Sequence, residues 1–211
     1  MTTALTRPLV PTLADVFRPT DAARARMYDL MLIVGGSLFV AVCAQVAIPT
    51  GAIPMTLQTF AVMVVGALLG SKRGAAALAL YLAEGAVGLP VFAGFHAGMP
   101  LLSSGYIVGF IPAAFVIGSL AERGWDRRLW TNFAAMLLGN AIVFAFGLAW
   151  LYAITTVLSG SFQSVEISSG DVLAVGLMPY IIADAWIKIA AATALLPLGW
   201  KLLGRRSDDR A

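Results

Sequence analysis

The chain has 211 residues, of which 60% are hydrophobic and only 12% are charged. Soluble domains carry about 45–50% apolar and about 25% charged residues, so this composition excludes an ordinary soluble domain. The sequence pI is near 9.3, but the basic residues stand in short clusters between apolar runs. That arrangement indicates membrane topology rather than a surface for nucleic acid, and no nucleic-acid partner is expected.

Six apolar segments follow a polar N-terminal stretch. A spanning helix needs about 20 mostly apolar residues, and the second, third and fourth segments are short by that measure. They would cross by extending into their flanks or where the bilayer is thin, while the fifth and sixth would tilt. The segments are 30–48, 55–70, 74–89, 106–121, 133–158 and 172–203.

The apolar segments divide the chain into three parts. We expect residues 1–29 to form a cytoplasmic N-terminal segment that could be an interfacial helix. Residues 30–203 would form a six-helix membrane domain, and 204–211 a cytoplasmic tail. The first apolar run is too long for a signal peptide and lacks a small-residue cleavage site, so it is expected to be a true span.

The positive charges alternate between the two sides of these segments. All but one of the 14 Lys and Arg residues lie before the first segment, between the second and third, between the fourth and fifth, or at and beyond the end of the last; the exception is Lys188. The connections 49–54, 88–105 and 159–171 contain no Lys or Arg. Because cytoplasmic loops collect Lys and Arg, the pattern predicts an all-α membrane protein with six crossings and both termini in the cytoplasm.

Three ionisable residues fall inside the apolar segments: Glu84, Asp184 and Lys188. Such groups are costly at membrane depth and usually face the bundle interior or a cavity. Asp184 and Lys188 are four residues apart and would share one helical face. They form either an internal salt bridge or a polar site for a ligand with both donors and an acidic group. A buried ion pair is a weak source of stability, which favours the ligand site.

Two of the uncharged connections differ from ordinary solvated loops. Residues 49–58 contain two prolines and a glycine, which predicts a rigid turn that presents Thr56 and Gln58 at the start of the second segment. Residues 88–105 are apolar and glycine-rich, and His96 is their one titratable side chain. We expect this loop to fold over a site as a lid. His96 itself is expected to be an ordinary polar loop residue.

Small residues and missing motifs narrow the function further. Ser37 and Ala41 form a small-xxx-small pair that either packs inside the chain or docks a partner membrane protein. No Walker A, HExxH, CxxC or GxSxG motif occurs, so neither ATP hydrolysis nor another catalytic activity is predicted. The single cysteine, Cys43, lies in an apolar run and is expected only to pack.

Several short stretches, in order between about residues 30 and 200, resemble a known family. Each is weak alone, and together they are specific. They are IPMTLQTF at 53–60, GAVGLPVFAG at 85–94, GY at 105–106, GF at 109–110, AERGWDR at 121–127, GN at 139–140, Gly147 with WL at 150–151, and the region of Asp184 and Lys188. The chain resembles the biotin-binding S component (BioY) family of energy-coupling factor (ECF) transporters.

The resemblance implies a fold, a ligand and partners. The fold would be six transmembrane helices, with external loops 1 and 3 capping an outward-facing substrate site. Biotin would be the transported ligand, with no cofactor, in a multi-pass protein of the cell membrane. An ECF transmembrane coupling protein and an ATPase pair would be the partners, besides membrane lipid. The small residues Ser37 and Ala41 would face the coupling protein.

Biotin also fits the residue chemistry, because it carries a ureido ring, an apolar thioether ring and a carboxylate. Asp184 would accept the ureido N–H groups, and Lys188 would pair with the carboxylate or a carbonyl. Aromatic side chains would cover the apolar body. The expected substrate contacts are Thr56, Gln58, Phe92, Gly94, Tyr106, Asn140, Asp184, Trp186 and Lys188.

The sequence departs from the family pattern at two places. The family's Gly-Pro-Thr-Gly-Gly-Tyr text before the fourth span is Leu-Ser-Ser-Gly-Tyr at 102–106 here, and the acid and base of the sixth span are four rather than three apart. Three other interpretations stay open: an S component for another vitamin, a solitary biotin permease, and a membrane enzyme. An enzyme would have only Asp184, Lys188, Glu84 and His96 as candidate catalytic residues.

Overall fold

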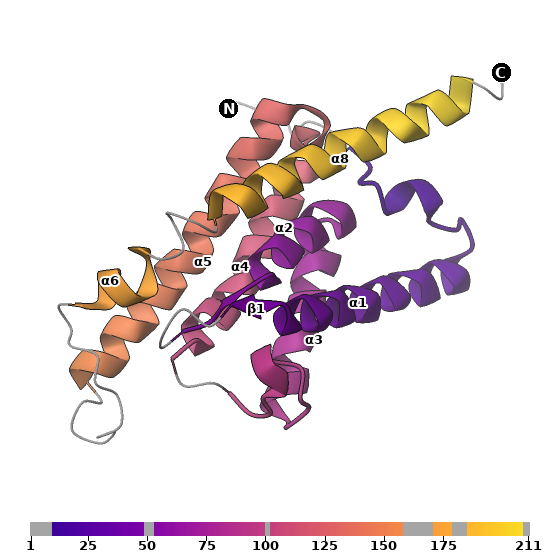
Figure 1. Ribbon diagram of the computed structural model, residues 1–211. Coiled ribbons are helices and arrows are strands. Elements are labelled where there is room, and N and C mark those ends of the chain that lie inside the picture. The colour runs from indigo at the N-terminus through magenta and orange to yellow at the C-terminus, as the bar shows by residue number, and fades with distance from the viewer. Residues whose placement is uncertain (1–9, 49–52, 100–101, 158–170, 179–184, 209–211) are drawn as a thin grey trace, which may run out of the picture.

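A computed structural model describes residues 10–48, 53–99, 102–157, 171–178 and 185–208 of the chain (Figure 1). These residues are mostly helical. Three helices, α1, α4 and α5, are long and apolar enough to span a membrane, and α2 is a shorter apolar helix. The long helices are α1 (Ala22–Gln45), α2 (Gln58–Leu69), α3 (Ser71–Ala86), α4 (Ser104–Ala121), α5 (Leu129–Val157) and α8 (Ala185–Asp208).

Short elements connect these helices. Two strands, β1 (Ala47–Ile48) and β2 (Met55–Thr56), pair antiparallel between α1 and α2. Single 3-10 turns precede α1, precede α4 and precede α5, and a short helix lies between α5 and α8. These are η1 (Asp15–Phe17), η2 (Ala93–Phe95), η3 (Trp125–Arg127) and α6 (Val172–Gly176).

The first predicted span begins earlier than its apolar run suggests. The Asp21 side chain accepts a hydrogen bond of 2.9 Å from the backbone N–H of Arg24, which is the bond that starts a helix at an N-cap. Helix α1 therefore begins at Ala22. The polar residues 22–29 are the first turns of this helix and do not form a separate interfacial helix.

The last predicted segment, 172–203, is not one helix. Helix α6 ends at Gly176, and Leu177 leaves the helical conformation with φ −125° and ψ −51°. Glycine weakens a helix, and Gly176 is the residue at which α6 ends. An averaged count of apolar residues across 172–203 does not register this break, which is why the sequence predicted a single span.

Helix α4 is the central element of the bundle. Its apolar stretch is 67% buried, against 28% for that of α1. Gly66 of α2 lies against α4 so closely that a Cβ atom there would approach the Ala114 carbonyl oxygen to 2.9 Å. Gly66 thus serves helix packing inside the chain. Helix α1 lies at the periphery and exposes a stripe formed by Leu30, Val34, Leu38 and Val42.

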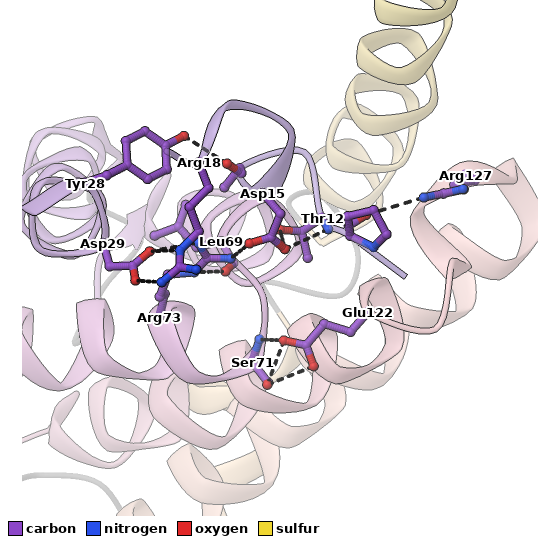
Figure 2. Close-up of polar contacts among 12 residues, drawn as sticks. Thr12, Asp15, Arg18, Tyr28, Asp29, Leu69, Ser71, Arg73, Glu122 and Arg127 are labelled. Carbon is purple, nitrogen blue, oxygen red and sulfur yellow. Dashed lines mark hydrogen bonds and ion pairs between the residues drawn. The ribbon is translucent and has the colours of Figure 1, made fainter. Parts of the chain in front are cut away.

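One end of the bundle is held by ion pairs, which Figure 2 shows. The guanidinium of Arg73 donates to Asp15 at 2.5 Å, to Asp29 at 3.1 Å and to the Leu69 carbonyl at 2.8 Å. Arg18 also pairs with Asp29, at 2.7 Å. The segment before α1 is thereby tied to the ends of α2 and α3.

This network lowers the pKa of the Asp15 carboxyl group. Partial burial would raise its pKa, but hydrogen bonds from the Thr12 backbone N–H and from Arg73 outweigh burial, and the pKa is lowered.

Nearby, Glu122 at the end of α4 accepts hydrogen bonds from the backbone N–H and the hydroxyl of Ser71, at 2.7 and 2.9 Å. Glu122 thus satisfies backbone donors at the start of α3.

Trp200 of α8 reaches the same end of the bundle. Its indole N–H donates to Oδ2 of Asp126 at 2.6 Å, and the Arg127 guanidinium lies 4.4 Å from the Trp200 ring centroid. Asp126 is 1% exposed, and burial raises its pKa. We call this region, defined by Asp15, Asp29, Arg73, Glu122 and Asp126, the charged end.

The opposite end holds no such ion pair among the described residues. Gln45, Thr56, Val91 and Lys188 meet there through hydrogen bonds, and we call it the pocket end. In Figure 1 the far end of α8 lies at the top of the view and the connection after α3 lies at the bottom. The six crossings and the cytoplasmic termini expected from the distribution of Lys and Arg stay a prediction.

Candidate functional site

A cavity opens among α2, α4, α5 and α8 at the pocket end. Its interior volume is only about 50 Å³, so the site is nearly closed in this structure. Small-molecule sites combine apolar walls with a few placed polar groups, and this lining does so. The lining residues are Ile53, Pro54, Thr56, Gln58, Thr59, Ser103, Tyr106, Ile107, Phe110, Asn140, Val143, Phe144 and Lys188.

Lys188 is the one cationic residue among those that line the cavity. It lies in the first turn of α8 and is only 6% exposed. Its ammonium donates a hydrogen bond to the backbone carbonyl of Thr56. A buried ammonium is stable when its donors are satisfied, and its charge attracts an anionic group into the cavity.

Neutral polar side chains face the same cavity. Gln58 is 7% exposed and Asn140 is 8% exposed, and each amide offers both donors and an acceptor. The hydroxyl of Thr56 donates to the Gln58 amide oxygen at 2.7 Å, and the Gln58 amide nitrogen donates to Tyr81 at 2.6 Å. These bonds fix the orientation of the Gln58 amide.

The remaining wall is apolar and aromatic. Tyr106 and Phe144 pack edge to face, with ring centroids 6.0 Å apart and planes at 90°. The Tyr106 hydroxyl donates to the Gly176 carbonyl at 2.8 Å, so its ring is held by α6. Such a wall suits a flat apolar body, while Lys188 and the amides suit an anionic tail and a polar head. No group of acidic, His and Cys residues that could hold a metal occurs among the described residues.

The cavity brings together five of the predicted contacts from four helices and one strand. Asp184 lies outside the described residues. Among the described contacts, the five that line the cavity are Thr56, Gln58, Tyr106, Asn140 and Lys188.

Phe92, Gly94 and Trp186 do not line the cavity. Phe92 is 1% exposed and packs its ring against Gly85, where a Cβ atom would lie 2.0 Å from the ring. Gly94 lies in the turn η2. Trp186 is 54% exposed and stacks on Phe133, with centroids 6.4 Å apart. In this structure the first fills the core, the second makes a turn and the third faces outward, and their contact with a ligand stays a prediction.

The predicted docking residues face the inside of the bundle. Ser37 is fully buried and donates to Glu84 of α3 at 2.5 Å. Ala41 is half-buried and packs against the core. In this structure the pair Ser37 and Ala41 packs inside the chain, which is one of the two roles considered for it. Glu84, which accepts the hydrogen bond from Ser37, is half-buried.

Several lining residues were not predicted from the sequence. Phe110 stands four residues after Tyr106, and Phe144 stands four after Asn140. Residues spaced by four share a helical face, so this spacing could have extended the predicted site along α4 and α5. Nothing local marks Ile53 or Ser103, since their place in the cavity depends on how the connections fold back.

A bundle of apolar helices with a buried cation in a small cavity at one end defines a multi-pass membrane protein with a small-molecule site. A model of the BioY family matches residues 18–205. The chain belongs to the BioY family, which is a family of membrane transport proteins rather than of enzymes.

Individual relatives agree with this membership. A biotin transporter BioY of Thermotoga maritima is 36% identical over 183 residues, covering 85% of this chain and 95% of that protein. A biotin transporter BioY of Rhodobacter capsulatus is 42% identical over 125 residues, covering 54% and 65% respectively. The crystal structure of the S component for biotin from an ECF-type ABC transporter matches with a TM-score of 0.70 at 25% identity, covering 87% of this chain and 95% of that one.

Proposed function

We propose that this protein binds biotin with high affinity at the pocket end and delivers it into the cell. The observation that carries the proposal is the composition of the cavity. It holds one buried cation, two neutral amides and an aromatic wall, which correspond to the carboxylate, the ureido ring and the thioether ring of biotin. The relatives named as biotin transporters support the same ligand.

Each part of biotin has a partner in the cavity. Lys188 pairs with the carboxylate, because a bond in which both partners are ionised is stronger than its present bond to a neutral carbonyl. Gln58 and Asn140 exchange hydrogen bonds with the ureido group, and Asp184 accepts its N–H groups. Tyr106, with Phe144 beside it, covers the apolar ring.

The membrane arrangement that fits this function has six crossings, cytoplasmic termini and a pocket that opens outward. The distribution of Lys and Arg supports it. Ile53 and Pro54 of the first external connection already line the cavity, and residues 87–99 pack at the same end. These connections are external loops 1 and 3, which close over bound biotin.

Energy for uptake comes from partners in this proposal. The chain carries no nucleotide-binding motif, and the match to an S component supports an ATPase pair and a transmembrane coupling protein. The coupling protein docks on α1, near Ser37 and Ala41. Because Ser37 bonds to α3 and Ala41 packs against the core in this structure, such a contact would involve the exposed neighbours Val34 and Leu38 as well.

The test is a titration of the purified full chain in detergent with biotin, and with thiamine and riboflavin as competitors. We expect one biotin to bind and the other vitamins not to compete. Lys188→Met should weaken binding about 10- to 100-fold, the effect of losing one charge-assisted contact. Lys201→Met, at an exposed position of the same helix, should bind as the wild type does.

Two results would overturn the proposal. One is a wild-type protein that is folded but shows no saturable biotin binding. The other is a double variant Asp184→Asn and Lys188→Met that binds biotin as tightly as the wild type, because neither residue would then contact the ligand. If the pair were only a structural salt bridge, each single change would destabilise the fold and the double change would restore it.

A further inference from the structure

A continuous line of hydrogen bonds leads out of the cavity to the external connection after α3. Lys188 donates to the Thr56 carbonyl, and the Thr56 hydroxyl donates to Gln58 at 2.7 Å. Gln58 donates to the Tyr81 hydroxyl oxygen at 2.6 Å, and Tyr81 donates to the Val91 carbonyl at 3.2 Å. The line joins α8, β2, α2 and α3 to a segment that does not line the cavity.

The direction of these bonds is determined by their chemistry. Tyr81 has a single hydroxyl proton, and the Val91 carbonyl can only accept it. Gln58 must therefore present its NH₂ group to Tyr81, which leaves its carbonyl oxygen for Thr56. Reversing the Gln58 amide would leave the Thr56 hydroxyl able to accept from the NH₂ group, but it would set the amide oxygen against the Tyr81 oxygen and break that bond. The state of Gln58 in the cavity is therefore coupled to Tyr81.

Gln45, near the end of α1, holds the same external segment from its other side. Its amide nitrogen donates to the Ala41 and Phe92 carbonyls, each at 3.1 Å. Its amide oxygen accepts the backbone N–H of Phe95 at 3.0 Å. One side chain thus ties both ends of the turn η2 to the bundle.

That turn needs to be held. Phe95 has a positive φ of 57°, which is uncommon for a residue other than glycine and stores strain. Its side chain is 69% exposed, so packing does not hold it in place. Phe92, by contrast, is inserted against Gly85 and meets the Tyr81 ring edge to face, with centroids 5.3 Å apart. The segment is anchored at Phe92 and restrained at Phe95 by Gln45.

We propose that Tyr81 and Gln45 are positioning residues that couple the external segment 91–95 to the ligand cavity and thereby set how fast bound ligand leaves. Neither residue lines the cavity. Tyr81 is fully buried between the cavity wall and Val91. A ligand that fixes Gln58 fixes Tyr81 and the Val91 carbonyl, and Gln45 extends this restraint to the strained turn. The inference rests on the proposed function, since biotin is taken as the ligand.

The test measures biotin dissociation from Tyr81→Phe, which keeps the ring against Phe92 and removes only the hydroxyl. We expect dissociation about three- to tenfold faster than in the wild type, which is the effect of one neutral hydrogen bond, with little change in association. Tyr28→Phe is the matched control, because Tyr28 also donates to a backbone carbonyl, that of Ala14, at the charged end. It should release biotin at the wild-type rate.

A second measurement needs no ligand. Amide hydrogen exchange in ligand-free Tyr81→Phe should become faster on both sides of Tyr81, at 55–58 and at 91–98, and Gln45→Leu should accelerate exchange at 91–98. The melting temperature of each ligand-free variant should stay close to that of the wild type. A purely structural role would instead lower the melting temperature and accelerate exchange throughout the bundle.

The outcomes separate this inference from the proposed function. Biotin binding with unchanged dissociation from both variants overturns the coupling and leaves the ligand assignment intact. Absence of biotin binding by the wild type overturns the ligand assignment, and exchange at 55–58 and 91–98 then decides the coupling alone. Exchange in Tyr81→Phe that rises on one side only, or on neither, overturns the coupling.

Discussion

The two ends of the bundle are held by different kinds of interaction. At the charged end, Arg73 bonds two carboxylates and a carbonyl, and Asp126 is bonded by Trp200. At the pocket end, Gln45 and Tyr81 make neutral hydrogen bonds to backbone groups. Bonds with an ionised partner are about twice as strong as neutral ones. The charged end has several of them, against the bond of Lys188 to the Thr56 carbonyl at the pocket end, so the charged end is the more firmly closed of the two.

This difference matches what each end has to do in the proposed cycle. A small molecule can compete with neutral hydrogen bonds that each contribute about 0.5–1.5 kcal/mol. Residues such as Gln58 and Thr56 can therefore exchange a protein partner for a ligand partner at little cost. The ion pairs around Arg73 keep the other end of the helices together while the pocket end opens.

The largest effect is expected from Arg73→Met. This change leaves Asp15 and Asp29 partly buried without their shared partner, which should cost about 3 kcal/mol of unfolding free energy. The loss should appear as a lower melting temperature in detergent, with biotin affinity at permissive temperature near that of the wild type. Arg18→Met is the control and should have a much smaller effect, because its side chain is 43% exposed. Equal melting of the two variants would show that Arg73 does not organise this end.

A smaller loss is expected from Trp200→Phe. Oδ1 of Asp126 already has no hydrogen-bond partner among the described residues, so removing the indole N–H leaves the buried carboxylate with neither oxygen bonded. We expect a loss of about 2 kcal/mol, the range of a hydrogen bond to a charged group. Trp130→Phe, at a position 86% exposed, controls for the change of ring. A melting temperature for Trp200→Phe equal to that control would contradict the role given to this bond.

The smallest effect concerns pH. The folded pKa of Asp15 is lowered from its usual value of 3.8, so its ionised form stabilises the fold above that value. This contribution is lost as the pH falls below 3.8 through the folded pKa. Asp15→Asn should therefore melt below the wild type near pH 7, and the gap should close in acid. A gap independent of pH would show that the charge of Asp15 is not what Arg73 recognises.

The sequence predicted the charged end less well than the pocket end. Arg73 and Arg18 were counted only as markers of topology, because their pairing with Asp15 and Asp29 depends on how the N-terminal segment folds across α2 and α3. Lys188, by contrast, stood out as a cation within an apolar run, and its position alone indicated a site.

Within the pocket end, residue chemistry indicated positions that line the cavity, whereas positions set by backbone geometry could not be inferred; ligand contact stays a prediction at all of them. Gln58 and Asn140 are polar groups on apolar helices, and both line the cavity. Phe92 and Trp186 were chosen as aromatic residues, but aromatic character does not distinguish a ligand wall from a core or an outward face. Tyr81 was missed because its role follows from the position of Val91, which the pattern of residues does not show.

The most direct test of the difference between the charged end and the pocket end is amide hydrogen exchange of the whole protein, measured with and without biotin. The account predicts that biotin slows exchange at the pocket end, at residues 55–58 and 91–98, and leaves the charged end around Asp15, Arg73 and Asp126 unchanged. Protection that is equal at both ends, or that appears only at the charged end, would contradict the claim that ligand binding and helix anchoring are divided between them.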